Sequence, residues 1–513
     1  MKKSRLNMTM RNAFWSYFSM IASLIIQFVS RTIFIQKLGE TYLGVNGLFT
    51  NVLGLLSFAE LGIGTAMNFA LYKPVANGDK EKIKSYMKAY KTAYRLIALV
   101  VAVLGLAIVP FLNFIVKDPG NIGDIRIYYV LFLLNTITSY FVSYKYSLAN
   151  AEQKGYIQTN THLITVYVKN IIQIVALFLL PNYLVYLIAG VVIDIIQRFF
   201  ISMYLNKLYP YLKEKDVKPL EKEEKETLIT KVKALIMHKI GDVCVHQTDN
   251  IIVSAFVSIK MVGLLSNYNL LITTVTTCVN LLFNSATGSL GNLVATESKE
   301  RQHYIFCVYR FLAFWFYGFT SIALFTLLTP FINLWIGEAM VVDEFVILLI
   351  IINYYMMGHR NCLGNFKSAA GVFEQDKFVA IIQSAVNLVA SVGLVLVIGL
   401  PGVYIGTIIQ GAISSIVKPV LTYKPVFGKS SKYYFIDAVK YGIVVIIAGA
   451  ICFAVRYFLL SEINILRFIL MTLVVVVVPN LIFFLCFRKT EEFRYLTKTL
   501  KSKLSRKTKN TEE

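Results

Sequence analysis

Basic residues lie well inside the long apolar stretches of this sequence. The clearest examples are Lys169, Arg198, Arg310 and Arg360. A charge at membrane depth costs about 3 kcal/mol or more unless it faces a partner or water, so such residues usually line a pathway. Arginine can also hold phosphate oxygens in bidentate fashion. We therefore expect these four side chains to bind an anionic cargo in a hydrated cavity, without covalent chemistry.

Two of these cations have a second interpretation. Asp194 and Arg198 are four residues apart, a spacing that suits an ion pair along one face of a helix. Such a pair would have a structural role, although Arg198 would still meet phosphate when the cavity opens. Lys169 would likewise either face the cavity or form an ion pair within its own half of the protein.

A carboxylate also stands inside an apolar stretch. Glu60, in the segment SFAELGIGTA, is close to Gly62 and Gly64 and is expected in the middle of a helix. At that depth a carboxylate is a candidate for binding the H⁺ or Na⁺ that would drive a transport cycle. The alternative is a hydrogen-bonded packing role beside small residues.

The sequence has no catalytic motif. It contains no G-x-x-x-x-G-K-[ST] phosphate loop, no G-x-S-x-G and no H-E-x-x-H, and its five histidines are dispersed. The six cysteines form no C-x-x-C pair and are expected to pack as small apolar residues. The sequence therefore indicates neither an enzyme nor a metal protein, and no cofactor is expected beyond a coupling ion.

The composition is that of a polytopic membrane protein. Hydrophobic residues make up 57% of the 513 residues and charged residues 16%, against about 25% charged in an average soluble protein. The net charge of +22 would suggest nucleic acid if it stood on a soluble domain. Here Lys and Arg cluster in particular hydrophilic loops and at the C-terminus, so no nucleic-acid partner is expected.

About fourteen apolar stretches are long enough to cross a membrane, which takes about 20 residues of helix. An even number of spans places both termini on the same side. Lys and Arg are concentrated in every second loop and in the tail after Phe487, which the positive-inside rule assigns to the cytoplasm. We therefore expect an all-helical, multi-pass membrane protein with both termini in the cytoplasm.

The expected spans form two repeats. Setting the second half against the first at an offset of 219 residues places Gly44 against Gly263, and the offset holds across four helices. Repeats in the same orientation are related by an axis along the membrane normal. The expected layout is an N-lobe of six helices (1–206), a solvated Lys/Glu-rich linker (207–231), a C-lobe of six helices (232–423), two further helices (424–487) and a basic cytoplasmic tail (488–513).

The repeat also predicts a gate. Asp249 is equivalent to Ser30, which precedes Arg31, and both charged residues lie toward the outer ends of their helices. Because equivalent helices would meet near the axis, we expect Arg31 and Asp249 to form an outer-gate ion pair. Simple anchoring of each side chain at the membrane interface is the alternative.

Three stretches resemble a known family. They are LGETYLGVNGLFTNVLGLLSFAELGIGTA (38–66), ALYKPVANGDKEKIKSYM (70–87) and TDNIIVSAFVSIKMVGLLSNYNLL (248–271). They resemble the Wzx-type polysaccharide flippases, or oligosaccharide-unit translocases, of the multidrug/oligosaccharidyl-lipid/polysaccharide exporter superfamily. The resemblance covers essentially the whole chain, including the helix count and the arrangement of two lobes with an added helix pair.

The resemblance implies two lobes around a central cavity that works by alternating access. The implied cargo is an undecaprenyl-diphosphate-linked oligosaccharide, moved to the outer leaflet of a bacterial cytoplasmic membrane for capsule, O-antigen or exopolysaccharide export. Membrane lipids, a polysaccharide polymerase and glycosyltransferases are the implied partners. The alternatives are a lipid II flippase or a cation-coupled drug exporter, whose cavity should be acidic, and a membrane polysaccharide polymerase, which needs a larger outer loop.

Overall fold

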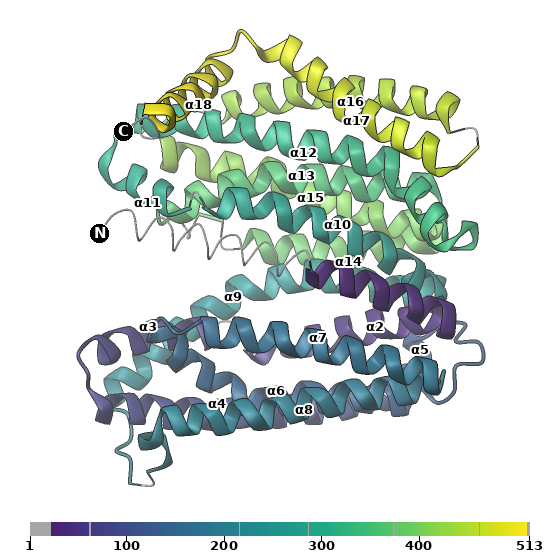
Figure 1. The fold of residues 1–513 in the computed structure, drawn as a ribbon. Coiled ribbons are helices and arrows are strands. Elements are labelled where there is room, and N and C mark those ends of the chain that lie inside the picture. Colours follow the sequence, from purple (N-terminus) through teal and green to yellow (C-terminus); the bar gives the residue numbers. More distant parts are fainter. Residues whose placement is uncertain are drawn as a thin grey trace. The chain divides into compact units, whose positions relative to one another are not determined.

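The computed structural model describes residues 22–60, 63–214, 216–285, 287–372, 375–376, 378–460 and 462–509. Within these ranges every regular element is a helix (Figure 1), which confirms the predicted all-helical class. Contacts divide the chain into two compact units, Met1–Gly263 and Leu264–Glu513.

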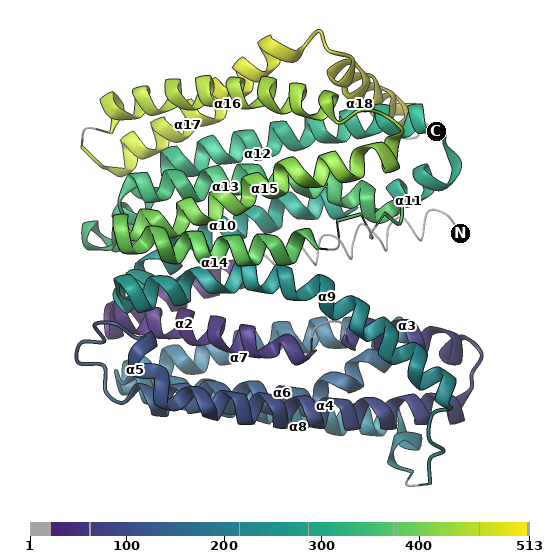
Figure 2. The ribbon, with the colours of Figure 1, turned by 180° about the vertical axis from the view of Figure 1, so that it is seen from behind.

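The first unit begins with a helix over 22–38. Its further helical elements are α2 (Glu40–Leu56), η1 (Ser57–Glu60), α3 (Ile63–Ala76), α4 (Lys80–Ile108), η2 (Val109–Phe111), α5 (Leu112–Ile115), α6 (Ile125–Ala151), α7 (Tyr156–Leu179), α8 (Tyr183–Leu208), η3 (Pro210–Lys213), α9 (Lys222–Ile252) and η4 (Val253–Val257). α6 lies alongside both α4 and α8, and α7 packs on α8 (Figure 2). α9 packs against α2 and α3, so its contacts place it in this unit, although it follows the expected linker.

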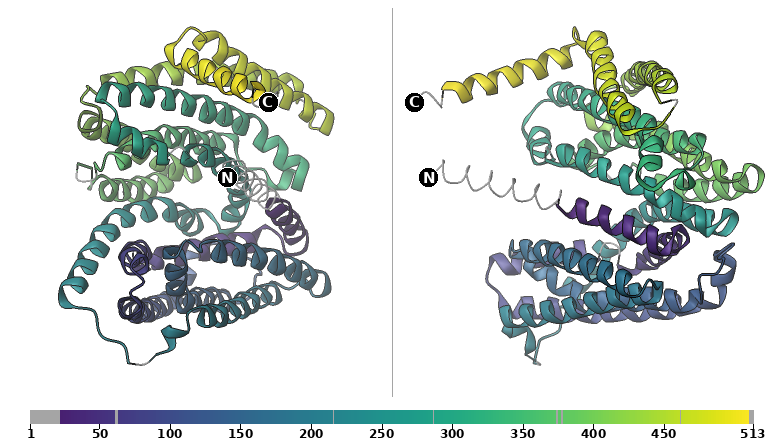
Figure 3. Two further views of the ribbon diagram at one scale, coloured as in Figure 1. Left: turned by 60° about the vertical axis from the view of Figure 1, so that its left-hand side comes forward. Right: turned by 45° about the vertical axis from the view of Figure 1, so that its right-hand side comes forward.

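The second unit starts within α10. Its elements are α10 (Ile259–Ser285), α11 (Thr287–Thr296), α12 (Lys299–Ile336), η5 (Glu338–Met340), α13 (Glu344–Ala369), α14 (Val379–Ile398), α15 (Leu400–Phe427), α16 (Lys432–Leu459), α17 (Ile465–Phe487) and α18 (Glu491–Lys509). α13 packs against α12 and α15, and α15 packs against α14. α16 and α17 lie on α12 over a core of Phe311, Phe314, Tyr441 and Phe483, and α18 follows α17 (Figure 3).

In the described part of the chain, eleven helices are long and apolar enough to cross a membrane. Three further expected spans are not among them. The first begins in residues 1–21, outside the described part of the chain. The second is interrupted, because α2 ends at Leu56 and η1 carries the chain to Glu60. The third is α9, whose apolar part contains Lys239, Asp242 and Asp249.

Polar residues determine where several helices begin. Asp79 accepts a hydrogen bond from the backbone N–H of Lys82 at 3.0 Å, and Asn182 accepts one from that of Leu184 at 2.8 Å. Caps of this kind satisfy N–H groups that the first turn of a helix leaves unpaired. They fix the starts of α4 and α8, and with them the depth of the side chains farther along.

The segment expected to be a solvated linker is partly helical. The sequence predicts an irregular stretch over 207–231, but α9 already begins at Lys222. Glu214, in the same stretch, accepts a hydrogen bond from Lys84 Nζ at 2.6 Å at the start of α4. The alternating Lys and Glu residues therefore support helix and local ion pairs as well as contact with water.

Two glycines allow α2 and the start of α10 to cross in backbone contact. A Cβ at Gly44 would overlap the carbonyl oxygen of Ile259, and a Cβ at Gly263 would overlap that of Glu40. The ion pair between Lys260 Nζ and Glu40 Oε1, 2.9 Å apart, lies beside the crossing. Gly44 and Gly263 are the residues that the 219-residue offset sets against each other, and their contacts are reciprocal.

Candidate functional site

An ion pair lies at the middle of the first unit's spans. Lys169 Nζ on α7 is 2.7 Å from Asp194 Oδ2 on α8, and the same oxygen accepts a hydrogen bond from Asn135 Nδ2 on α6 at 2.9 Å. Lys169 lies near the midpoint of α7. Only 14% of the Asp194 side chain is exposed. Because both charges are at membrane depth, each stabilises the other.

Glycine lets α7 and α8 approach each other at this pair. A Cβ at Gly190 would lie 2.5 Å from Gln173 Nε2 and 3.1 Å from Lys169 Cε. Gln173 Nε2 also donates to the backbone carbonyl of Tyr186 at 3.1 Å. The missing side chain at Gly190 therefore makes room for the two long side chains that join the helices.

A polar cavity of about 220 Å³ adjoins the ion pair. It is lined by Asn46 and Thr50 of α2, Phe132 and Asn135 of α6, Lys169 and Gln173 of α7, and Tyr186, Leu187, Gly190 and Val191 of α8. Amide and hydroxyl groups of this kind can bind sugar hydroxyls as well as phosphate oxygens. Sequence reasoning missed most of these residues, because polar side chains within spans also form ordinary helix–helix hydrogen bonds.

Among the described residues, Arg198 forms no close ion pair with Asp194, although the carboxylate still acts electrostatically on the guanidinium. Its Nη1 donates to the backbone carbonyl of Asn135 at 2.8 Å and to the hydroxyl of Thr138, both on α6. Among the residues that the structure describes, the ion-pair partner of Asp194 is Lys169. The spacing-based expectation of an i,i+4 pair is wrong here, because the neighbouring helices offer both side chains other partners.

Arg310 is a packing residue in this structure. Its side chain is 2% exposed, and its Nη2 donates to the backbone carbonyl of Tyr434 on α16 at 2.6 Å. The guanidinium lies 3.8 Å above the centre of the Tyr434 ring, and Asp437 Oδ2 is 3.8 Å from Nη1. Arg310 thus joins α12 to α16 in this arrangement of the helices, and its predicted contact with an anionic cargo stays a prediction.

We expect Arg310→Met to lower the stability of the solubilised protein. The substitution removes a charge-assisted hydrogen bond and leaves a buried carbonyl unpaired, at a cost of about 2 kcal/mol. Thermal unfolding in detergent would measure the loss. A variant that unfolds like the parent but no longer transports cargo would instead return Arg310 to the cargo pathway.

Arg360 is placed differently from Arg310. It is half-buried on α13, and its Nη1 donates to the backbone carbonyl of Gly411 on α15 at 2.9 Å. No carboxylate forms an ion pair with Arg360 among the described residues. Its predicted contact with an anionic cargo stays a prediction. The one hydrogen bond to Gly411 uses only part of the hydrogen-bonding capacity of the guanidinium.

The two units carry related but unequal clusters. Asn353 lies 218 positions after Asn135, and Gly411 lies 217 positions after Asp194. Both separations are close to the repeat offset of 219. A Cβ at Gly411 would lie 2.9 Å from Arg360 Nη1 and 3.2 Å from Asn353 Oδ1. The second unit thus has glycine at the place of the carboxylate, with an arginine beside it. Lys169 and Asp194 neutralise each other in the first unit, whereas Arg360 has no ion-pair partner among the described residues of the second.

The gate residues lie in the first unit. Arg31, on the helix over 22–38, is half-buried and interacts electrostatically with Tyr186, which lines the polar cavity. Asp249 is half-buried near the end of α9. The ion pair between Arg31 and Asp249 stays a prediction.

Glu60 lies at a helix interruption and not in the middle of a helix. It ends the turn η1, and its Oε1 accepts a hydrogen bond from the hydroxyl of Tyr94 on α4 at 3.2 Å. In the described part of the chain, no group of three or more His, Cys, Asp or Glu residues is arranged to hold a metal ion. The role of Glu60 in binding a coupling ion stays a prediction.

Comparison with solved structures identifies the fold. The chain is similar to the lipid II flippase MurJ in an inward closed conformation, with a TM-score of 0.63 and 16% identity over 92% of this chain and 98% of that one. The chain has a MATE/MurJ-like fold. An inward-facing multidrug resistance MATE family transporter of the MOP superfamily is also similar, with a TM-score of 0.62 and 15% identity over 77% and 92% of the two chains.

A third structure with this fold is a point mutant of the Vibrio cholerae MATE transporter VcmN, with a TM-score of 0.55 and 14% identity over 82% of this chain and 97% of that one. No family model matches the chain, and no curated protein matches its sequence. The MATE/MurJ-like fold therefore rests on structure, and the particular resemblance to Wzx-type flippases on the sequence stretches quoted above.

Proposed function

We propose that this protein is a flippase for undecaprenyl-diphosphate-linked oligosaccharides, working by alternating access in a bacterial cytoplasmic membrane with both termini in the cytoplasm. The observation that carries the proposal is the balance of charge at membrane depth. The carboxylate Asp194 is neutralised by Lys169, whereas Arg198 and Arg360 have no ion-pair partner among the described residues. The net charge left over is positive, which suits a diphosphate.

The polar cavity is suited to binding the sugar part of the proposed cargo. Asn46, Thr50, Asn135, Gln173 and Tyr186 offer hydrogen-bond donors and acceptors within one small space. In the absence of cargo, the ion pair stabilises Lys169 at mid-span. A diphosphate that enters would compete with Asp194 for the ammonium group, and sugar hydroxyls would bind the surrounding amides.

Two other cargoes are consistent with the fold. A lipid II flippase is a second candidate, because MurJ matches this chain nearly from end to end and lipid II also has a diphosphate head. A drug exporter for organic cations is disfavoured, because Asp194 is already paired with a cation. A polysaccharide polymerase and glycosyltransferases are the partners that the proposed cargo requires.

The test is transport by the purified protein in liposomes. We expect it to move an undecaprenyl-diphosphate-linked oligosaccharide between leaflets, measured as the fraction of sugar that a membrane-impermeant oxidant reaches. Lipid II and a fluorescent organic cation are the parallel substrates. Transport of the dye without movement of either lipid would overturn the proposal, and movement of lipid II alone would reassign the cargo.

Gly411 offers a sharp test of the cation at Arg360. We expect Gly411→Asp to place a carboxylate beside the guanidinium, as Asp194 stands beside Lys169, and to reduce flipping about tenfold through loss of one charge-assisted contact. Gly411→Asn is the matched control, because it crowds the site equally without a charge. Equal flipping by both variants would show that the charge of Arg360 does not contribute.

A further inference from the structure

The equivalent helix pairs of the two units pack differently. α14 and α15 are joined along their lengths: Gln383 Nε2 donates to Gln410 Oε1 at 3.0 Å, Asn387 Nδ2 to Thr407 Oγ1 at 3.2 Å, and the Ser391 hydroxyl to a backbone carbonyl of α15 at 3.0 Å. α7 and α8 are joined by the Lys169 and Gln173 contacts, which lie in the half of the pair toward the connection between these helices.

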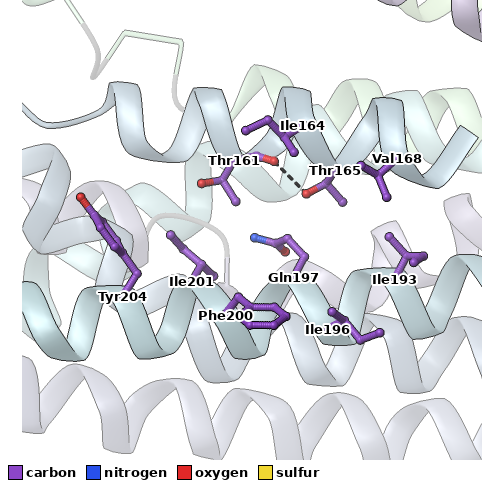
Figure 4. A pocket seen from close by; sticks show the side chains of 10 residues that line it. All are labelled: Thr161, Ile164, Thr165, Val168, Ile193, Ile196, Gln197, Phe200, Ile201 and Tyr204. Carbon is purple, nitrogen blue, oxygen red and sulfur yellow. Dashed lines mark hydrogen bonds between the residues drawn. The ribbon is translucent and has the colours of Figure 1, made fainter. Parts of the chain in front are cut away.

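Beyond the ion pair, the facing side chains of α7 and α8 are large and apolar. They line a groove of about 400 Å³ that is open on one side. Its main lining residues are Ile164 and Val168 of α7 and Ile193, Ile196 and Phe200 of α8 (Figure 4). Ile164 and Phe200 are each 63% exposed. Within a membrane these side chains face hydrocarbon, so a lipid chain can lie against them through van der Waals packing.

Two polar side chains of the groove have partners within the helices. The Thr165 hydroxyl donates to the backbone carbonyl of Thr161 at 2.7 Å, a contact drawn in Figure 4. Gln197 Nε2 is 3.4 Å from the hydroxyl of Tyr146 on α6, outside the groove. Because most of the other lining side chains are apolar, the groove is suited to hydrocarbon more than to a polar ligand.

The length of the groove suits a lipid chain in one leaflet. Its wall on α8, from Ile193 to Tyr204, is about 16 Å long at 1.5 Å per residue, which is roughly half of a hydrocarbon core of about 30 Å. With a volume of about 400 Å³, the groove can receive a hydrocarbon chain that lies along the two helices.

The ends of the groove distinguish head from tail. Lys207 is exposed one turn beyond Tyr204 on the same face of α8, at the end that the charge distribution assigns to the cytoplasm. At the other end, Val168 and Ile193 directly precede Lys169 and Asp194, so this end of the groove lies at the level of the ion pair along α7 and α8.

We propose that the α7–α8 groove holds the polyprenyl chain of the cargo in the inner leaflet, with its phosphate near Lys207, before the head enters the polar cavity. The proposal rests on the proposed function and adds a loading site to it. The head then has a short path along α7 and α8 to Lys169, and the chain need not leave the hydrocarbon.

The first experiment maps the chain directly. A polyprenyl phosphate with a photoreactive group midway along its chain is crosslinked to the protein in liposomes, and the attachment sites are identified by mass spectrometry. Crosslinks are expected within 161–168 and 193–204. Unlabelled polyprenyl phosphate is expected to suppress them at about one tenth of the concentration that an anionic phospholipid requires. Equal competition by the phospholipid, or crosslinks only elsewhere, would overturn the proposal. This result does not depend on flipping, so it is separate from the test of function.

The second experiment fills the groove. Ile164→Trp is expected to raise the half-saturating concentration of polyprenyl-linked cargo about tenfold, and to leave a short-chain analogue with the same head unaffected. Ile171→Trp is the matched control, because Ile171 is 53% exposed on the same helix but does not line the groove. Equal effects of the two variants, or an equal effect on both cargoes, would overturn the loading site even if the parent protein flips its cargo.

Discussion

Replacing Lys169 with leucine is expected to abolish most flipping and also to destabilise the first unit. The substitution leaves Asp194 at mid-span with Asn135 as its remaining contact. Removing one partner of a buried ion pair typically costs about 3–5 kcal/mol. Loss of the cation from the cargo site should reduce flipping about 10- to 100-fold, the factor that corresponds to a charge-assisted contact of about 1.5–3 kcal/mol.

The double substitution Lys169→Leu with Asp194→Leu separates the two effects. Replacing both partners of a buried pair by apolar residues is often neutral for stability. We therefore expect the double variant to unfold at the temperature of the parent and to flip cargo as poorly as the single variant. A double variant that flips normally would show that the ion pair only holds α7 against α8.

Replacing Gly44 with alanine is expected to lower the yield of folded protein sharply. The added Cβ would overlap the carbonyl oxygen of Ile259, and backbone cannot move aside as a flexible side chain can. Overpacking costs about 1–3 kcal/mol in ordinary cores, and the upper end applies where the obstacle is backbone. Gly263→Ala should have the same effect, because its Cβ would overlap the carbonyl oxygen of Glu40.

Gly393→Ala is the matched control for the crossing. Gly393 lies within α14, and a Cβ there would meet nothing within 4 Å. Alanine favours helix over glycine by about 1 kcal/mol, so this variant should fold at least as well as the parent. Size-exclusion chromatography and thermal unfolding of the three variants give the comparison. Normal folding of both Gly44→Ala and Gly263→Ala would show that the helices cross with more freedom than the structure indicates.

Hydropathy and turn chemistry predict most of the helices. Length and apolar content suffice for α6, α7 and α8, whose starts also carry polar caps or short connections. They fail around Glu60, which is expected in the middle of a helix but ends the short turn η1 after α2. A window of average hydropathy cannot detect such a break, because the break depends on local backbone hydrogen bonding and on the contact with Tyr94.

The candidate site was only partly predictable. Placing Lys169 and Asp194 within spans follows from the sequence, and so does the need for a partner at that depth. The identity of the partner of each charged side chain does not follow from the sequence. Spacing favours Asp194 with Arg198, yet Asp194 pairs with Lys169, which is 25 residues away. Arg310 likewise meets Tyr434, a contact between α12 and α16 that no local pattern indicates.

The sequence by itself determined that this chain is a helical membrane protein with an excess of buried positive charge and a repeat that pairs Gly44 with Gly263. These properties depend on composition and period, which are local or additive. The tertiary structure alone decided which cations are neutralised, which are packed away and which stay accessible. Those outcomes depend on which helices are neighbours, because at low dielectric a charge is stabilised by the partner within a few ångströms and not by its position in the sequence.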